Sequence, residues 1–148
     1  MTDIITLIKI GIAALGGFVG AFLGSVDGLV ITLIIFMAVD YLTGVAVGIS
    51  EKKLSSETGF KGLLRKILIL ALVGIANCID VYILKQGSVI RAAVIFFYLS
   101  NEGISILENT AALGLPIPKK LKDVLEQLSK ESGEEKHHDS DSEERHDK

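Results

Sequence analysis

The residues best suited to chemistry in this sequence are ionisable or amide side chains that stand inside otherwise apolar stretches. They are Asp40, Asp80, Arg91, Asn101 and Glu102. A charged side chain near the middle of a membrane costs about 2.5–3.5 kcal/mol on insertion scales, so such residues face a bundle interior or water and usually have a role. These side chains could therefore carry ions or protons, or they could join helices by pairing. For Asp40, near the middle of its stretch, we expect a part in function or assembly.

Two further patterns among the polar residues leave alternatives open. Asp80 and Arg91 fall at similar heights in consecutive apolar segments, so they could form an ion pair or extend separately to the nearby interface. Asn101, Ser105 and Glu108 recur at i, i+4 and i+7, which gives one helix a polar stripe. That stripe could line an aqueous lesion in an assembly, or it could face the water at the membrane surface.

No catalytic or cofactor-binding pattern accompanies these residues. The sequence contains no Ser/His/Asp set, no paired catalytic carboxylates and no phosphate-binding loop. Cys78 is the single cysteine, which excludes an intramolecular disulfide. The histidines lie in an acidic tail without the ligand spacing of a rigid metal site. We therefore expect neither an enzyme nor a bound metal or cofactor, and the lack of a broad basic surface excludes nucleic acid as a partner.

Apolar stretches of membrane-spanning length hold the polar residues. Hydrophobic residues make up 49% of the 148 residues, and they gather at 5–24, 29–49, 67–84 and from residue 89 onward. About 20 apolar residues in a helix cross the roughly 30 Å of hydrocarbon in a bilayer, and in lipid a helix satisfies its own backbone. The sequence predicts an all-α integral membrane bundle of four spans, or three if the last segment leaves the membrane early. Only residues 25–28 separate the first two segments, which predicts a tight helical hairpin.

Glycines recur every fourth residue in the first two segments. They are Gly16, Gly20 and Gly24 in the first segment, and Gly44 and Gly48 in the second. Small residues at this spacing let helix backbones approach closely in lipid. The pattern fits helix packing either between subunits or within one subunit, and the sequence does not separate the two.

A polar, basic connector over residues 51–66 sets the predicted orientation. Its bases are Lys52, Lys53, Lys61, Arg65 and Lys66. By the positive-inside rule this connector is cytoplasmic, and with four spans both termini are cytoplasmic too. We expect a transmembrane domain over residues 1–117, a cytoplasmic amphipathic helix over 118–132, and a disordered charged tail over 133–148.

Several blocks of sequence, in order, resemble one known family. They are 38–44 (AVDYLTG), 53–66 (KLSSETGFKGLLRK), the Ile79-Asp80 pair, 96–109 (FFYLSNEGISILEN) and 114–121 (GLPIPKKL). Together they resemble the toxin-secretion/phage-lysis holins of phages and prophages of Gram-positive bacteria. The resemblance covers roughly residues 29–130.

The resemblance implies a non-enzymatic protein of the bacterial cytoplasmic membrane that assembles with its own copies into lesions. Such lesions let a cell-wall hydrolase (an endolysin), or in some relatives a toxin, leave the cell, and no catalytic residue or cofactor transfers from the family. The implied partners are the lipid bilayer, further copies, and the endolysin or toxin. Two other hypotheses are a small ion- or proton-coupled transporter that uses Asp40, Asp80 and Glu102, and a membrane adaptor that recruits a soluble partner.

Overall fold

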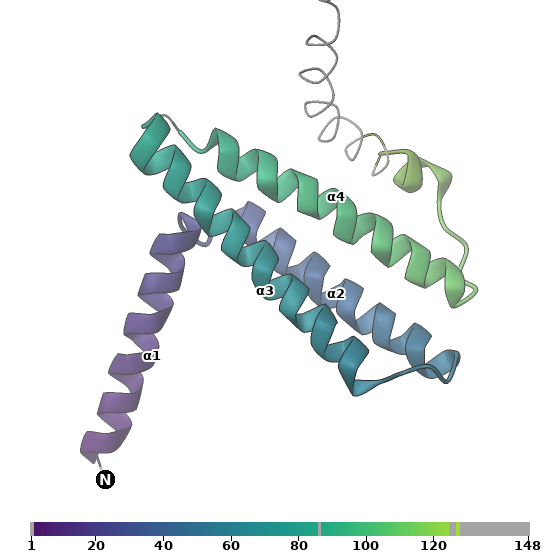
Figure 1. Cartoon of the computed structure of the whole chain (residues 1–148), viewed down its shortest axis with the longest axis horizontal. Helices are drawn as coiled ribbons and strands as arrows, with labels where there is room; N and C mark the ends of the chain where they lie inside the picture. The colour runs from purple at the N-terminus through teal and green to yellow at the C-terminus, as the bar shows by residue number, and fades with distance from the viewer. Residues whose placement is uncertain (1, 86, 125–126, 128–148) are drawn as a thin grey trace, which may run out of the picture.

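The computed structural model describes residues 2–85, 87–124 and 127, and it is built from helices (Figure 1). Helix α1 covers Thr2–Leu23, α2 covers Gly28–Ser50, α3 covers Ser56–Cys78 and α4 covers Val89–Ala112. The π-helical segment η1, Ile79–Leu84, continues α3 without a break. No strand occurs within the described residues, where four helices, with α3 and η1 counted as one, are long and apolar enough to cross a membrane. The all-α prediction and the count of four spans are confirmed.

Side-chain caps fix where α2 and α3 begin. Asp27 accepts a hydrogen bond of 3.1 Å from the backbone N–H of Val30, and Ser55 accepts one of 3.1 Å from that of Thr58. Such caps satisfy the first backbone donors of a helix. Because Ser55 starts α3, the helix begins at Ser56 rather than at residue 67, and only residues 51–55 connect it to α2.

The predicted connector is therefore largely helical. Lys52 and Lys53 lie at its start, outside the helices, whereas Lys61, Arg65 and Lys66 lie on α3. Beyond α4, Lys119–Val124 are helical, at the start of the predicted amphipathic helix. The rest of that helix apart from residue 127, and the predicted disordered tail, lie outside the described residues.

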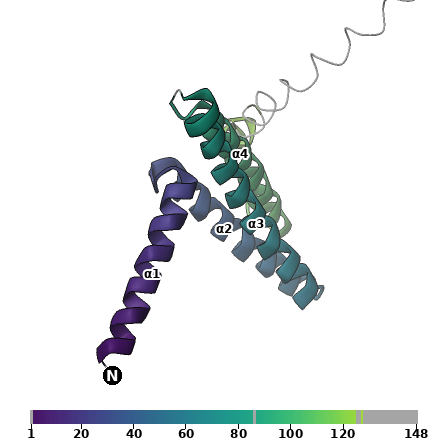
Figure 2. The ribbon, with the colours of Figure 1, turned by 60° about the vertical axis from the view of Figure 1, so that its left-hand side comes forward.

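Helices α2, α3 and α4 form a three-helix bundle, and α1 projects away from it (Figures 1 and 2). The predicted hairpin of α1 and α2 is therefore wrong. Two consecutive residues with left-handed backbone, Gly24 at φ 80° and Ser25 at φ 79°, turn the chain after α1. Instead of pairing with α2, the C-terminal end of α1 rests on α3, where Asn77 donates hydrogen bonds to the carbonyls of Ala21 and Phe22.

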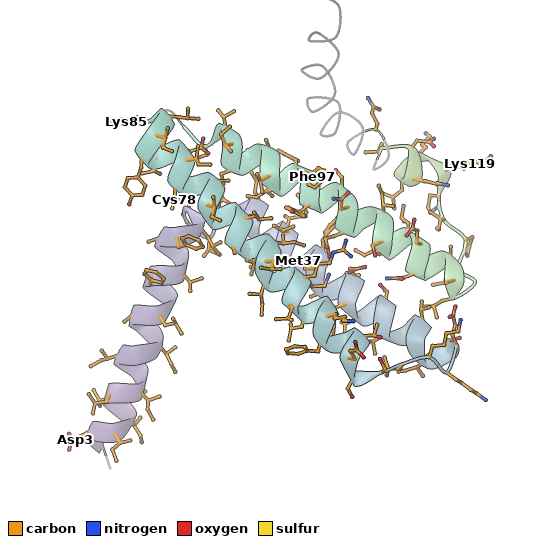
Figure 3. The ribbon with its side chains drawn as sticks, viewed as in Figure 1. Asp3, Met37, Cys78, Lys85, Phe97 and Lys119 are labelled. Carbon is orange, nitrogen blue, oxygen red and sulfur yellow. The ribbon has the colours of Figure 1, made fainter. Side chains whose placement is uncertain are left out.

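The buried apolar core lies in the half of the bundle nearest the end of α1. Its members are Leu23, Val30, Leu33, Met37, Ile69, Val73 and Ile95. Many other large apolar side chains point outward, and those of α1 project on all sides with no helix beside most of its length (Figure 3). An apolar exterior of this extent suits a surface surrounded by lipid.

Candidate functional site

A lysine on α3 joins carboxylates from the two neighbouring helices. The ammonium of Lys66 lies 2.7 Å from the Asp40 carboxylate on α2, and it also pairs with the Glu102 carboxylate on α4. The three side chains are only 8–17% exposed. Two acids singled out from the sequence thus meet in space, and their shared partner is a residue assigned to the basic connector.

Asn109 of α4 extends this arrangement on the side of Asp40. Its amide nitrogen donates to the Asp40 carboxylate at 3.2 Å and to the Thr43 hydroxyl oxygen at 3.1 Å. Asp40, Lys66, Glu102 and Asn109 are called the polar cluster below. Within it, each carboxylate is hydrogen-bonded inside a single copy, which offsets much of the cost of holding charge at this depth.

A cavity of about 560 Å³ adjoins the polar cluster between α2, α3 and α4. It extends from Leu54, in the connector, to Ile69 and Tyr98 in the middle of the bundle. The residues of the predicted polar stripe, Asn101, Ser105 and Glu108, all lie on its wall. In one copy, therefore, the stripe faces a cavity inside the bundle.

Arg91 forms a second buried cluster at the end of the bundle next to α1. Its guanidinium lies 2.7 Å from the Asp27 carboxylate and donates to the carbonyls of Leu23 at 2.6 Å and Ser25 at 3.0 Å. Arg91 is 2% exposed. It thereby ties the start of α4 to the turn between α1 and α2. Sequence reasoning missed Asp27, although an acid directly before an apolar helix is a common cap.

Asp80 uses its carboxylate to cap α4 from η1. It accepts hydrogen bonds from the backbone N–H groups of Ile90 at 3.1 Å and Arg91 at 2.8 Å, and it is 1% exposed. Asp80 and Arg91 are neighbours, but the described residues contain no ion pair between their side chains. Neither side chain extends to the interface. The sequence suggested either an Asp80–Arg91 ion pair or separate extension to the interface, and the structure shows neither arrangement.

The Arg91 cluster also sets the acidity of Asp27, which lies in the turn between two spans. Hydrogen bonds from the Arg91 guanidinium and from the backbone N–H of Val30 lower the pKa of Asp27 from 3.8 to about 2. Both interactions favour the charged carboxylate over the neutral acid. Asp27 is therefore ionised at any physiological pH.

The glycines of the two predicted rows have different surroundings. A methyl group on Gly44 would lie 3.6 Å from the Asn109 amide, and one on Gly48 would lie 3.2 Å from Leu54. Gly16 has no atom within 4 Å of that position, and Gly20 has one at 4.0 Å. The α2 glycines thus pack within the chain, whereas Gly16 faces open space and Gly20 is half-buried beside Val26.

Two close approaches involve glycines near the end of α1. Gly24 lies against Asn77, and Gly74 lies against the ring of Phe22, in each case nearer than a methyl group would permit. Sequence reasoning included Gly24 but missed Gly74. An isolated glycine in an apolar helix gives little signal, because glycine is common in membrane helices.

Comparison with known proteins points to one family. A family model described as the bacteriophage holin family matches residues 17–130. An uncharacterized 14.9 kDa protein of Clostridium perfringens is 46% identical over 87% of this chain and 98% of its own length, and one of Listeria innocua is 46% identical over 91% and 96%. A probable holin of Bacillus phage phi105 is 37% identical over 63% of this chain and 68% of its own. No solved structure matches the chain significantly.

Proposed function

Because this chain belongs to the bacteriophage holin family, we propose that it permeabilises a bacterial cytoplasmic membrane by assembling with its own copies. The lesion then releases an endolysin to the cell wall, or a toxin from the cell. The observation that carries the proposal is the family match over residues 17–130 on a chain with four helices of membrane-spanning length. The holin family is not a family of enzymes, and we propose that this chain likewise catalyses no reaction.

The internal pairing of charges supports a harmless phase before assembly. Lys66 pairs with two carboxylates inside one copy, which leaves one net negative charge among the three groups and keeps all three largely inside the bundle. Such a copy can accumulate without disturbing the bilayer, because its costly groups already have partners. Polar surface then reaches the membrane only when copies meet and rearrange.

Helix α1 is the element best placed to begin contacts between copies. It has no neighbouring helix along most of its length, and Gly16 lies on its open surface. Small residues in membrane helices permit close backbone contact. We propose that α1 packs against a second copy, with residues 51–55 and both termini on the cytoplasmic side.

A transporter is the second candidate, and the cavity beside the polar cluster is the observation that favours it. Against it, membrane transporters commonly consist of internal repeats with sites near the midplane between them, and this chain has no such repeat. An adaptor role rests on the basic residues alone and has no structural support of its own.

Expression in a bacterial host separates these functions. A holin leaves the membrane tight during accumulation and then produces abrupt dye uptake with loss of membrane potential. Co-expression with an endolysin should then lyse the culture, whereas the endolysin alone, as the matched control, should not. A membrane that stays tight at high abundance of the chain would contradict the proposal.

A further inference from the structure

We propose that one copy of this chain already contains a water-filled vestibule, which enters the bundle at the connector and ends at the polar cluster. Water is thus present inside the connector-side half of each subunit before any lesion forms. The vestibule itself does not depend on the proposed function. Its consequence for lesion formation, given below, rests on that function.

The position of the cavity supplies the first argument. Its lining begins at Leu54 and Thr58, next to the connector, and it reaches Ile69 and Tyr98 at mid-bundle. Its lining also includes Arg65 and Glu108, whose side chains are exposed. The cavity therefore reaches from the connector to mid-bundle with exposed charged residues in its lining, which suits entry of water from the connector side.

Polar side chains on its wall supply the second argument. Among residues 2–85, 87–124 and 127, neither the Asn101 amide nor the Ser105 hydroxyl has a side-chain hydrogen-bond partner, yet both line the cavity. An unbonded amide or hydroxyl in a dry apolar medium costs several kcal/mol. A cavity of about 560 Å³ has room for many waters, each needing two to four polar partners. Water inside it satisfies these groups and the polar cluster together.

The apolar core closes the other end. Beyond the polar cluster, Leu33, Val73 and Ile95 are fully buried and pack together. This apolar plug separates the vestibule from the Arg91 cluster. A single copy therefore admits water halfway across the membrane without letting ions through.

The vestibule would change what assembly has to accomplish. If the proposed function holds, part of the wet lining of a lesion exists inside every subunit, and assembly has only to displace the plug. Asn101, Ser105 and Glu108 would then be in contact with water before and after the lesion opens.

Cysteine reactivity tests the vestibule in the full-length chain, in a Cys78→Ala background. Charged, membrane-impermeant methanethiosulfonates react with thiolates, which form in water and not in lipid. We expect Ser105→Cys to react quickly in intact vesicles from the same face as Lys53→Cys, a connector residue. Two control positions should react at least about tenfold more slowly: the outward-facing Leu68→Cys and the plug residue Val73→Cys.

Four results would overturn the proposal. The first two are a reaction of Ser105→Cys as slow as that of Leu68→Cys, and a fast reaction of Val73→Cys. The third is a reaction of Ser105→Cys from both faces of a tight membrane. The fourth is that Ser105→Cys no longer reacts when vesicles hold fewer than one copy each on average. The last result would assign the water to an assembly. Dye uptake by the parent chain is measured separately, so failure of the proposed function is distinguishable from failure of the vestibule.

Discussion

Lys66 holds two acids from different helices, so a single charge on α3 joins α2 and α4. Removal of one partner from a buried ion pair typically costs about 3–5 kcal/mol, because the other charge stays buried and unpaired. Here cavity water would screen part of that cost. Substitution of Lys66 should therefore lower the free energy of unfolding more than substitution of a lysine in an exposed ion pair.

We expect Lys66→Met to lower the free energy of unfolding by about 2–3 kcal/mol, since Asp40 and Glu102 then repel each other. The matched control is Lys61→Met, which breaks the exposed pair with Glu57 and should cost less than about 0.5 kcal/mol. Denaturant unfolding in detergent, followed by circular dichroism, measures both. Equal losses in the two variants would contradict the role given to Lys66.

Asp40→Leu should advance, delay or abolish permeabilisation, because it leaves Lys66 and Asn109 without a shared acceptor. Val39→Leu, its outward-facing neighbour on α2, serves as the control and should keep the parent timing. The time of dye uptake after induction, at equal membrane abundance, is the measurement. Parent-like timing in Asp40→Leu would show that the carboxylate is dispensable for function.

Asp27 should make stability depend on pH in a narrow acidic range. Its pKa is about 2 in the folded protein against 3.8 ordinarily, so its stabilising contribution is complete above pH 3.8 and disappears as the pH falls through 2. The melting temperature of the parent should exceed that of Asp27→Asn at pH 5, and the gap should shrink between pH 4 and 2. A gap that is constant with pH would contradict the Arg91–Asp27 pairing.

At the scale of elements, the turn after α1 depends on Gly24. Its φ of 80° disfavours other residues, and a methyl group would meet the Asn77 amide that bonds to α1. Gly24→Ala should therefore lower stability by about 1–3 kcal/mol. Gly16→Ala, in open surroundings, should be neutral or slightly stabilising, as expected for alanine in a helix.

The Gly16→Ala variant also separates an effect on folding from an effect on assembly. Because Gly16 faces outward, Gly16→Ala should keep or slightly raise the melting temperature while delaying dye uptake, if α1 packs against another copy. Unchanged timing in Gly16→Ala would count against α1 as the contact surface. A lower melting temperature would show instead that Gly16 packs within the chain.

The helices could be predicted from sequence because apolar runs of bilayer length leave few alternatives. The start of α3 could not, because polar residues such as Lys61 are compatible with either a connector or a capped helix. The angle of α1 was also missed, since a short turn predicts a hairpin unless contacts such as Phe22 on Gly74 are known.

The candidate site was predictable only in part, for a related reason. Asp40 and Glu102 stand out because charge is rare in apolar segments. Lys66 borders its segment and follows other bases, so hydropathy groups it with the connector. The rotation of α3 about its axis decides which of the charged residues at the start of the apolar segment point into the bundle. That rotation depends on how α3 packs against α2 and α4.

At the scale of the whole molecule, two polar centres stabilise a three-helix bundle whose exterior is apolar, one near the middle of the bundle and one at the end next to α1. The Arg91 cluster ties α4 to the turn after α1, and the polar cluster joins α2, α3 and α4 beside the cavity. One copy is therefore self-sufficient in lipid. On this view permeability is a property of the assembly and not of the single chain.

Counting copies while recording the membrane potential in single cells tests that claim most directly. With a fluorescent label on the chain, we expect mobile single copies in polarised cells, and clusters that form in the same interval in which the potential collapses. Collapse of the potential while the copies remain single would contradict the account, as would stable clusters in cells that keep their potential.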